Sequence, residues 1–297
     1  MAQKPRMHFA AARTEPGMNA SPNKAGVFIS ADMEGCSTLV HWDEVRPSDS
    51  WQYRRACEIY TAEVNAAAQG AFAAGIQRVV VNDAHSRMRN LIPDQLDPRI
   101  ELVTGSFKPY YMLQGIQAGG FAAAYFIGYH GGIGDAEAVM GHTYSPRVIF
   151  ECRLNGAVVG ELTINAALAG HFAIPVALVS GDRTTLAEAA RNIPWAQRVE
   201  TKKSMSYYAA DCLAPAAVCG LIRAAGADAA GLSDAKPLIL QSPISLEVDT
   251  QKTAQADVME WVPGFTRLGA RRVGFTGADM LQAYRALMTI IYLGATA

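Results

Sequence analysis

Short apolar runs recur along the first 180 residues of the chain. The runs at 27–32, 78–83 and 121–129 consist mainly of apolar residues and show no regular polar alternation. Such runs are typical of strands in a parallel sheet, because both faces of these strands are buried. Between the first two runs, residues 53–76 place apolar side chains at helical spacing and end near Gly75, which predicts a crossover helix. The pattern therefore predicts a parallel α/β sheet that begins near residue 27.

The later part of the chain adds an antiparallel detour and further α/β units. Segments 147–154 and 157–161 flank Asn155-Gly156, a dipeptide that favours a tight β-hairpin turn. The other expected elements are strands at 100–104, 175–180, 244–248 and 271–276, and helices from Thr185 and at 215–229, 254–261 and 278–293. The predicted fold class is α/β, with a mostly parallel central sheet flanked by helices, an inserted β-hairpin and a second α/β subdomain.

The polar residues that close these apolar runs are carboxylates and imidazoles. Asp32 and Glu34 end the first run, and their spacing puts both on one side of a strand. His85 follows the second run, His130 follows the third, and Glu161 ends the predicted hairpin. Taken alone, Glu161 would fit equally well as an acid in the first turn of a helix. Because ligands bind outside the carboxyl ends of the strands in open α/β sheets, we expect these side chains to meet at one edge of the sheet.

This combination of side chains points to a hydrolytic metal site. Two carboxylates one residue apart repel each other unless a cation lies between them or one stays protonated. The three charges of Asp32, Glu34 and Glu161 would be nearly balanced by two divalent cations with a hydroxide between them, whereas one cation would leave the site negative. The sequence therefore predicts two ions about 3.5 to 4 Å apart. The donor set favours zinc first and manganese or cobalt next.

His142 is the candidate for proton transfer. It follows a glycine-rich loop, and its intrinsic pKa suits the exchange of a proton near neutrality. We interpret it as an acid/base or oxyanion-stabilising group in amide hydrolysis by a metal-activated water; a nucleophilic role and a structural loop histidine remain alternatives. Asp83 either orients His85 or caps the turn. The segment 108–111 is a weaker candidate for lining the pocket, and Cys36 is interpreted as a small core residue.

Five motifs resemble those of a known family. In chain order they are Ser30-Ala31-Asp32-Met33-Glu34-Gly35, Asn82-Asp83-Ala84-His85-Ser86, Gly128-Tyr129-His130, Met140-Gly141-His142 and Val159-Gly160-Glu161-Leu162. In order and approximate spacing these motifs resemble those of the DppA-type zinc D-aminopeptidases, which are binuclear metallopeptidases associated with bacterial dipeptide-transport operons. The resemblance runs from about Val27 to the carboxyl terminus.

The resemblance implies a role for each of the six residues. Asp32 resembles the bridging metal ligand, His142 resembles the catalytic histidine, and the remaining ligands correspond to Glu34, His85, His130 and Glu161. The family also implies a homo-oligomer, in the form of a self-compartmentalising ring. The chain departs from the family pattern at Ala84, where serine is expected, at Gly141 and Thr143, and in a longer loop at 131–139. These departures bear on the substrate more than on the metal chemistry.

Composition and length limit the other possibilities. At 297 residues the chain exceeds the roughly 100 to 200 residues of a typical single domain. We expect a metal-binding half at 26–182 and a second half at 183–297 that supports the pocket and makes oligomer contacts. Residues 1–25 mix Pro, Asn, Lys, Arg and Gly with little periodicity, which predicts a disordered tail. His8, His41 and His171 are interpreted as structural or solvated.

Charge and cysteine usage indicate the compartment and the partners. The net charge is −1 and no basic stripe with interleaved aromatics occurs, so we expect no nucleic acid partner. The longest apolar runs fall short of the about 18 residues of a membrane span, and the amino terminus lacks the apolar core of a signal peptide. Five cysteines without a Cys-x-x-Cys pair suit free thiols, which favours a cytoplasmic protein.

The function predicted from these observations is a metal-dependent aminopeptidase that removes amino-terminal residues, including D-amino acids, from short peptides. Only the resemblance carries the stereochemistry, because ligand spacing does not distinguish a D from an L substrate. A binuclear amidohydrolase that acts on a non-peptide amide is the nearest alternative. A peptide-binding protein without catalysis is a more distant one, because it would have no use for three carboxylates and the histidine motifs.

Overall fold

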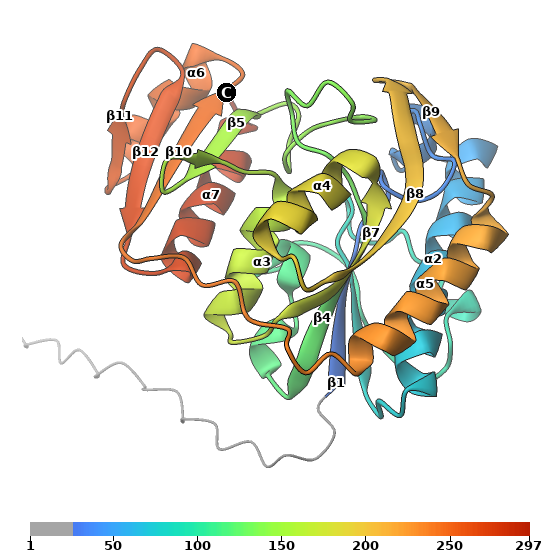
Figure 1. The fold of residues 1–297 in the computed structure, drawn as a ribbon. Coiled ribbons are helices and arrows are strands. Elements are labelled where there is room, and N and C mark those ends of the chain that lie inside the picture. The colour runs from blue at the N-terminus through green and yellow to red at the C-terminus, as the bar shows by residue number, and fades with distance from the viewer. Residues whose placement is uncertain (1–25) are drawn as a thin grey trace, which may run out of the picture.

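A computed structural model describes residues 26–297. The expected tail at 1–25, with His8, lies outside the described residues. The predicted fold class is confirmed: a mostly parallel sheet is flanked by helices, and a second sheet packs beside it (Figure 1). Within residues 26–297, no helix is both long and apolar enough to cross a membrane.

The central sheet has seven strands in the order β3-β2-β1-β4-β7-β8-β9. The first five are parallel to their neighbours, as is β8 to β7, and the edge strand β9 is antiparallel to β8. The strands are β1 (Gly26–Ala31), β2 (Val79–Asp83), β3 (Ile100–Val103), β4 (Phe121–Tyr129), β7 (Val176–Asp182), β8 (Gln197–Ser206) and β9 (Ala209–Cys212). Every residue of β1, β2 and β7 is buried, as the unbroken apolar runs predicted.

Helices cover both faces of this sheet (Figure 1). On one face, α2 (Trp51–Ala73) and α5 (Pro215–Ala230) pack against each other and enclose the side chains of alternate residues such as Val27 and Ile29. On the other face, α3 (Glu161–His171) and α4 (Arg183–Asn192) pack over the intervening residues, including Phe28. The strand alternation therefore divides the buried apolar residues into two cores.

The second sheet is antiparallel and has the strand order β11-β12-β10-β5-β6. Its helix α7 (Met280–Gly294) packs towards the central sheet and shares the α3 core (Figure 1). The strands are β5 (Ile149–Leu154), β6 (Ala157–Val158), β10 (Ile244–Thr250), β11 (Phe265–Arg267) and β12 (Arg272–Gly277). Asn155 and Gly156 turn the predicted hairpin with φ of 48° and 81°, as a tight turn of this kind requires.

Several short elements complete the described chain. Helix α1 (Trp42–Val45) follows the turn after β1, and α6 (Thr253–Asp257) follows β10. The 3₁₀ turns are η1 (Pro93–Gln95), η2 (Tyr111–Leu113), η3 (Ile116–Ala118) and η4 (Val258–Trp261). The strands β8, β9 and β11 and the helix α1 were not predicted.

Two details differ from the sequence expectations. The second hairpin strand ends at Val158, so Glu161 is the first residue of α3 rather than the end of a strand. Each sheet also draws strands from both sides of residue 182, since β8 and β9 join the central sheet while β5 and β6 join the second one. The division of the chain into halves at 182 stays a prediction, and the sheets do not separate there.

Candidate metal centre

Asp32 and Glu34 lie in the turn that follows β1, not on the strand itself. Their common direction therefore comes from the turn and not from strand alternation. The turn is held against the end of β4, where Asp32 N donates to Ile127 O at 2.8 Å and Gly35 N donates to Gly128 O at 2.8 Å. Both carboxylates are almost completely buried.

Glycines make this close approach possible. A Cβ added to Gly35 would lie 1.8 Å from the carbonyl oxygen of Tyr129, and one added to Gly181 on β7 would lie 1.9 Å from the same atom. Gly128 has φ of 72°, and a Cβ there would lie 2.1 Å from Asp32 O. The backbone around the end of β4 is thus tightly packed, which brings His130 next to the acidic turn.

Two side chains of β8 hold the same turn through hydrogen bonds. Thr201 Oγ1 donates to Gly35 O at 2.6 Å. The Lys202 ammonium is fully buried and donates to Glu34 O at 2.6 Å and to Leu39 O. The carbonyls of the turn are therefore satisfied by groups that the sequence analysis did not single out.

His85 lies just beyond β2 and faces both carboxylates. Its Nδ1 is 3.2 Å from Asp32 Oδ1 and 3.0 Å from Glu34 Oε2. Its Nε2 donates to Val45 O at 2.7 Å. A carbonyl oxygen only accepts, so Nε2 carries a proton and Nδ1 is the nitrogen that faces the carboxylates.

The Asp83 carboxylate forms no hydrogen bond with His85. Its carboxylate accepts hydrogen bonds from the backbone amides of Asn90 and Leu91 at 2.5 and 2.8 Å and from the Asn90 side chain at 2.8 Å. The Asn90 side chain in turn donates to His85 O at 2.7 Å. Asp83 therefore closes the turn that carries His85.

His130 follows β4 and faces a different carboxylate oxygen of Asp32. Its Nε2 is 3.4 Å from Asp32 Oδ2 and 3.3 Å from Glu161 Oε1. Its Nδ1 donates to Gly131 O at 2.9 Å, and Gly131 N donates to Asp182 Oδ2 at 3.0 Å. Asp182 thus holds the loop that orients the His130 ring.

His142 lies in the loop between β4 and β5. Its Nδ1 donates to Met140 O at 2.9 Å, and its Nε2 is 3.8 Å from both Glu34 Oε1 and Glu161 Oε1. The ring stacks on His130 with centroids 4.2 Å apart and meets the Trp42 ring edge-on at 5.2 Å. Burial and the neighbouring His130 lower the pKa of His142, so its Nε2 is a free base near neutral pH.

The three imidazoles share one arrangement. Each ring has one nitrogen bonded to a backbone carbonyl and the other directed at buried carboxylates, which is the arrangement that metal-binding histidines adopt. The groups with metal-binding spacing are Asp32–Glu34–His85, Asp32–His130–Glu161 and Glu34–His130–His142. In the first two groups, Asp32 is the shared member and turns one oxygen towards each.

Charges in the cluster depend strongly on one another. Burial, and then the Glu34 charge, raise the pKa of Asp32 to about 7. Burial would also raise the pKa of Glu34, but His85 and the other imidazoles outweigh it and hold that pKa well below its usual range. Burial opposes charge on His85 and His130, yet the facing carboxylates raise the pKa of both rings well above the usual value. The carboxylates therefore require positive charge beside them, which divalent cations supply when they replace these protons.

The residues also fit a metal by an independent criterion. Among the described residues, four buried side-chain atoms lack a hydrogen-bond partner, and two of them, Glu34 Oε2 and His130 Nε2, belong to this cluster. The 3.0 Å approach of His85 Nδ1 to Glu34 Oε2 lacks the alignment of a hydrogen bond. Such atoms are costly to bury unless something else contacts them. Nitrogen and oxygen donors without a thiolate suit zinc and similar divalent ions.

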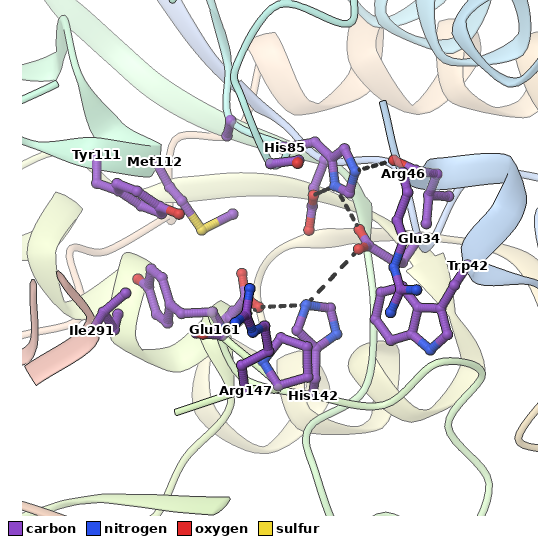
Figure 2. A pocket seen from close by; sticks show the side chains of 17 residues that line it. Glu34, Trp42, Arg46, His85, Tyr111, Met112, His142, Arg147, Glu161 and Ile291 are labelled. Atoms are coloured by element: carbon purple, nitrogen blue, oxygen red, sulfur yellow. Dashed lines mark hydrogen bonds and ion pairs between the residues drawn. The ribbon is translucent and has the colours of Figure 1, made fainter. Parts of the chain in front are cut away.

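A cavity of about 250 Å³ opens beside the cluster (Figure 2). Asp32, Glu34 and Glu161 form its acidic floor, and His85 and His142 border it. Trp42 and Arg46 lie on one side of the view, whereas Tyr111, Met112 and Ile291 lie on the other. Ala84, one of the departures from the family pattern, also lines this cavity.

Segment 108–111 and Cys36 are the remaining candidates from the sequence analysis. Tyr111 lines the cavity, but Lys108 is buried behind it and donates to Asn82 Oδ1 and Asp83 O, both at 2.7 Å. Cys36 is fully buried, where burial raises the pKa of its thiol well above the usual value. Residues 26–297 hold all five cysteines as free thiols.

Other residues of the site were not predicted. Trp42 is the first residue of the four-residue helix α1, and Arg46 directly follows this helix. Four residues are too few to show a helical period in the sequence. Asp182 had a signal in the sequence, because an aspartate directly before a helix is a typical N-cap. These unpredicted residues are Trp42, Arg46, Tyr144, Arg147, Asp182, Thr201 and Lys202.

Comparisons with known proteins agree with this geometry. A family model described as D-aminopeptidase matches residues 26–289. The D-aminopeptidase of Bacillus subtilis (strain 168) is 35% identical over 272 residues, which cover 90% of this chain and 97% of that protein. The solved structure of the Zn-dependent D-aminopeptidase DppA from Bacillus subtilis, described as a self-compartmentalizing protease, matches with a TM-score of 0.86 and 33% identity. That match covers 92% of this chain and 98% of that one.

Proposed function

The chain belongs to the D-aminopeptidase family, and from this premise we propose that it is a metal-dependent aminopeptidase that releases amino-terminal residues, including D-amino acids, from short peptides. The single observation that carries the proposal is the arrangement of the three histidines. Each is fixed by a backbone carbonyl and turns its other nitrogen to buried carboxylates that line one cavity.

Two divalent cations, zinc in the first instance, are the proposed cofactor. Asp32, Glu34 and His85 would hold one ion, and Asp32, His130 and Glu161 would hold the other, with Asp32 shared. The opposite directions of the two Asp32 oxygens support this sharing, and the zinc dependence of the Bacillus subtilis relative supports the choice of metal. When bound, the ions supply Lewis-acid polarisation of the peptide carbonyl and a water of lowered pKa.

His142 is the proposed proton carrier. Its Nδ1–H is held by Met140 O, which leaves Nε2 as the atom that takes a proton from the attacking water and returns it to the departing amine. Its Nε2 lies 3.8 Å from the nearest carboxylate oxygens, further than the nearest approaches of His85 and His130. The two groups that share Asp32 are complete without His142, which supports a catalytic rather than a ligand role. The lowered pKa of His142 supports a base at neutral pH, and no covalent step is required.

Neighbouring residues orient His142 and Glu161. Trp42 packs edge-on against His142 and limits its rotation. Tyr144 N donates to Glu161 Oε1 at 2.6 Å, which fixes the glutamate at the start of α3. Glu161 thereby keeps one oxygen towards His130 and His142.

A homo-oligomer that encloses its active sites is the proposed assembly. The Bacillus subtilis relative is described as self-compartmentalizing. Light scattering coupled to size exclusion tests this directly, and a monomer at micromolar concentration would refute it.

The first experiment is elemental analysis of gently purified, chelator-free enzyme together with a peptide panel. We expect close to two divalent ions per chain and release of the amino-terminal residue from D-alanyl peptides. A metal-loaded protein that cleaves only non-peptide amides would replace the peptidase with an amidohydrolase. A protein that stays empty when supplied with metal would remove the catalytic proposal and leave a peptide-binding protein.

A further inference from the structure

The cavity beside the metal cluster is lined by three chemically different kinds of side chain. The carboxylates of the cluster form its acidic floor, and Tyr111, Met112, Tyr144 and Ile291 are its largely apolar part. Arg46, on the Trp42 side, and Arg147, on the Glu161 side, are the only arginine or lysine residues that line it among the described residues (Figure 2). The proposed chemistry at the floor uses neither guanidinium.

Arg46 follows α1 and is held beside the catalytic residues. Its guanidinium carbon lies 5.2 Å from the centre of the Trp42 ring, a cation–π arrangement. Trp42 in turn contacts His142, and Val45, the residue before Arg46, accepts the hydrogen bond from His85. The position of Arg46 is therefore tied to two residues of the site.

Arg147 reaches the cavity from the turn before β5, on the Glu161 side of the view (Figure 2). Its backbone is anchored by the buried side chain of Gln255, which donates from Nε2 to Arg147 O at 2.9 Å. Within residues 26–297, neither Arg46 nor Arg147 forms an ion pair or a side-chain hydrogen bond with an acid. Both guanidinium groups are exposed and keep their donors free for a ligand.

We propose that Arg46 and Arg147 bind a carboxylate on the leaving part of the substrate, so that the enzyme selects short peptides that carry one. This inference rests on the aminopeptidase function proposed above. Guanidinium groups present planar pairs of donors that match a carboxylate. A carboxylate held by the arginines orients the substrate with its amine towards the metal cluster.

The lining of this cavity of about 250 Å³ includes both the carboxylates of the cluster and the two arginines. A short peptide that binds with its amine at the cluster keeps its carboxylate close to this lining, whereas a long chain carries its terminal carboxylate out of the cavity.

Three substrates test the proposal on the metal-loaded enzyme: D-alanyl-D-alanine, its carboxyl-terminal amide, and the α-amide of D-alanyl-D-glutamate. The first carries a terminal carboxylate, the second carries none, and the third carries one on the side chain only. We expect kcat/KM for the neutral amide to be at least about tenfold lower than for the free dipeptide, mainly through KM. The third substrate distinguishes a terminal from a side-chain carboxylate as the group that is bound.

Arginine variants test whether these two side chains cause the preference for a carboxylate. In Arg46→Gln and Arg147→Gln, kcat/KM for D-alanyl-D-alanine should fall about tenfold, while the neutral amide should change less than twofold. Arg89→Gln is the matched control, because Arg89 is an exposed arginine that lines a separate cavity. A merely structural role for Arg46 or Arg147 would lower the rates of all three substrates equally.

The outcomes separate this inference from the function on which it rests. Equal cleavage of all three substrates by the wild-type enzyme would overturn the carboxylate site and leave the aminopeptidase intact. Equal losses for charged and neutral substrates in both arginine variants would also overturn it. Failure to cleave any peptide or amide would refute the proposed function itself.

Discussion

Asp182 makes two hydrogen bonds that a single substitution removes together. As the N-cap of α4 its Oδ1 accepts from Thr185 N at 2.8 Å, and its Oδ2 accepts from Gly131 N at 3.0 Å. The side chain is fully buried, and Gly131 O is the acceptor that orients His130. Asp182→Ala therefore removes a helix cap and leaves a buried amide of the His130 loop without a partner.

The expected loss follows from these two bonds. Removal of an N-cap costs about 1 kcal/mol, and a buried N–H without an acceptor costs about 1 to 3 kcal/mol. Burial raises the pKa of Asp182, so relief of its desolvation offsets part of the loss. We expect the free energy of unfolding to fall by about 2 to 3 kcal/mol. Metal affinity should fall about 10- to 100-fold, the range for groups that orient a ligand.

Asp279→Ala is the matched control. Asp279 caps α7 in the same way, because it accepts from Gln282 N at 2.8 Å, but it makes no second bond to the metal loop. This variant should lose about 1 kcal/mol of stability and keep its metal affinity. Urea unfolding with and without chelator gives the stabilities, and competition with a chromophoric chelator gives the affinities. If Asp182→Ala matches Asp279→Ala in both measurements, Asp182 does not hold the His130 loop.

The remaining predictions concern the cluster and its glycine contacts. His142→Ala should keep its metal and lose about 100-fold or more in kcat, and full turnover in this variant would exclude proton transfer by His142. Asp32→Ala should lose its metal, which elemental analysis measures. Gly35→Ala should lose metal and stability, because its Cβ would lie 1.8 Å from Tyr129 O. Gly220→Ala, where nothing lies within 4 Å, should instead gain up to about 1 kcal/mol in urea unfolding.

The fold class and the ends of the parallel strands could be predicted because buried parallel strands leave an unbroken apolar signal. His85 and His130 follow the ends of β2 and β4 as that signal indicated. Glu161 lies beside Asp32 and His130, but it begins α3 instead of ending a strand, because a two-residue strand such as β6 is too short for its end to be located from the sequence. The ligand roles themselves stay predictions.

Strand β8 and its side chains were not predicted, because their surroundings differ from those that residues of these types usually have. Segment 197–206 is largely polar, so β8 does not show the period of a strand. Lys202 within it is typical of a surface position by composition, yet it is fully buried beneath the acidic turn. Its partners are backbone carbonyls 163 and 168 residues away, which no local pattern encodes.

The origin of the cavity walls has an evolutionary consequence. The proposed ligands come from the ends of central strands and the start of α3, whereas Ile291 lies on α7 and the Arg147 backbone is anchored by Gln255 of α6, both beside the second sheet. Mutations in the second sheet and its helices can therefore alter the accepted peptide without altering a ligand. Substrate range and hydrolytic chemistry can diverge at different rates in descendants of this chain.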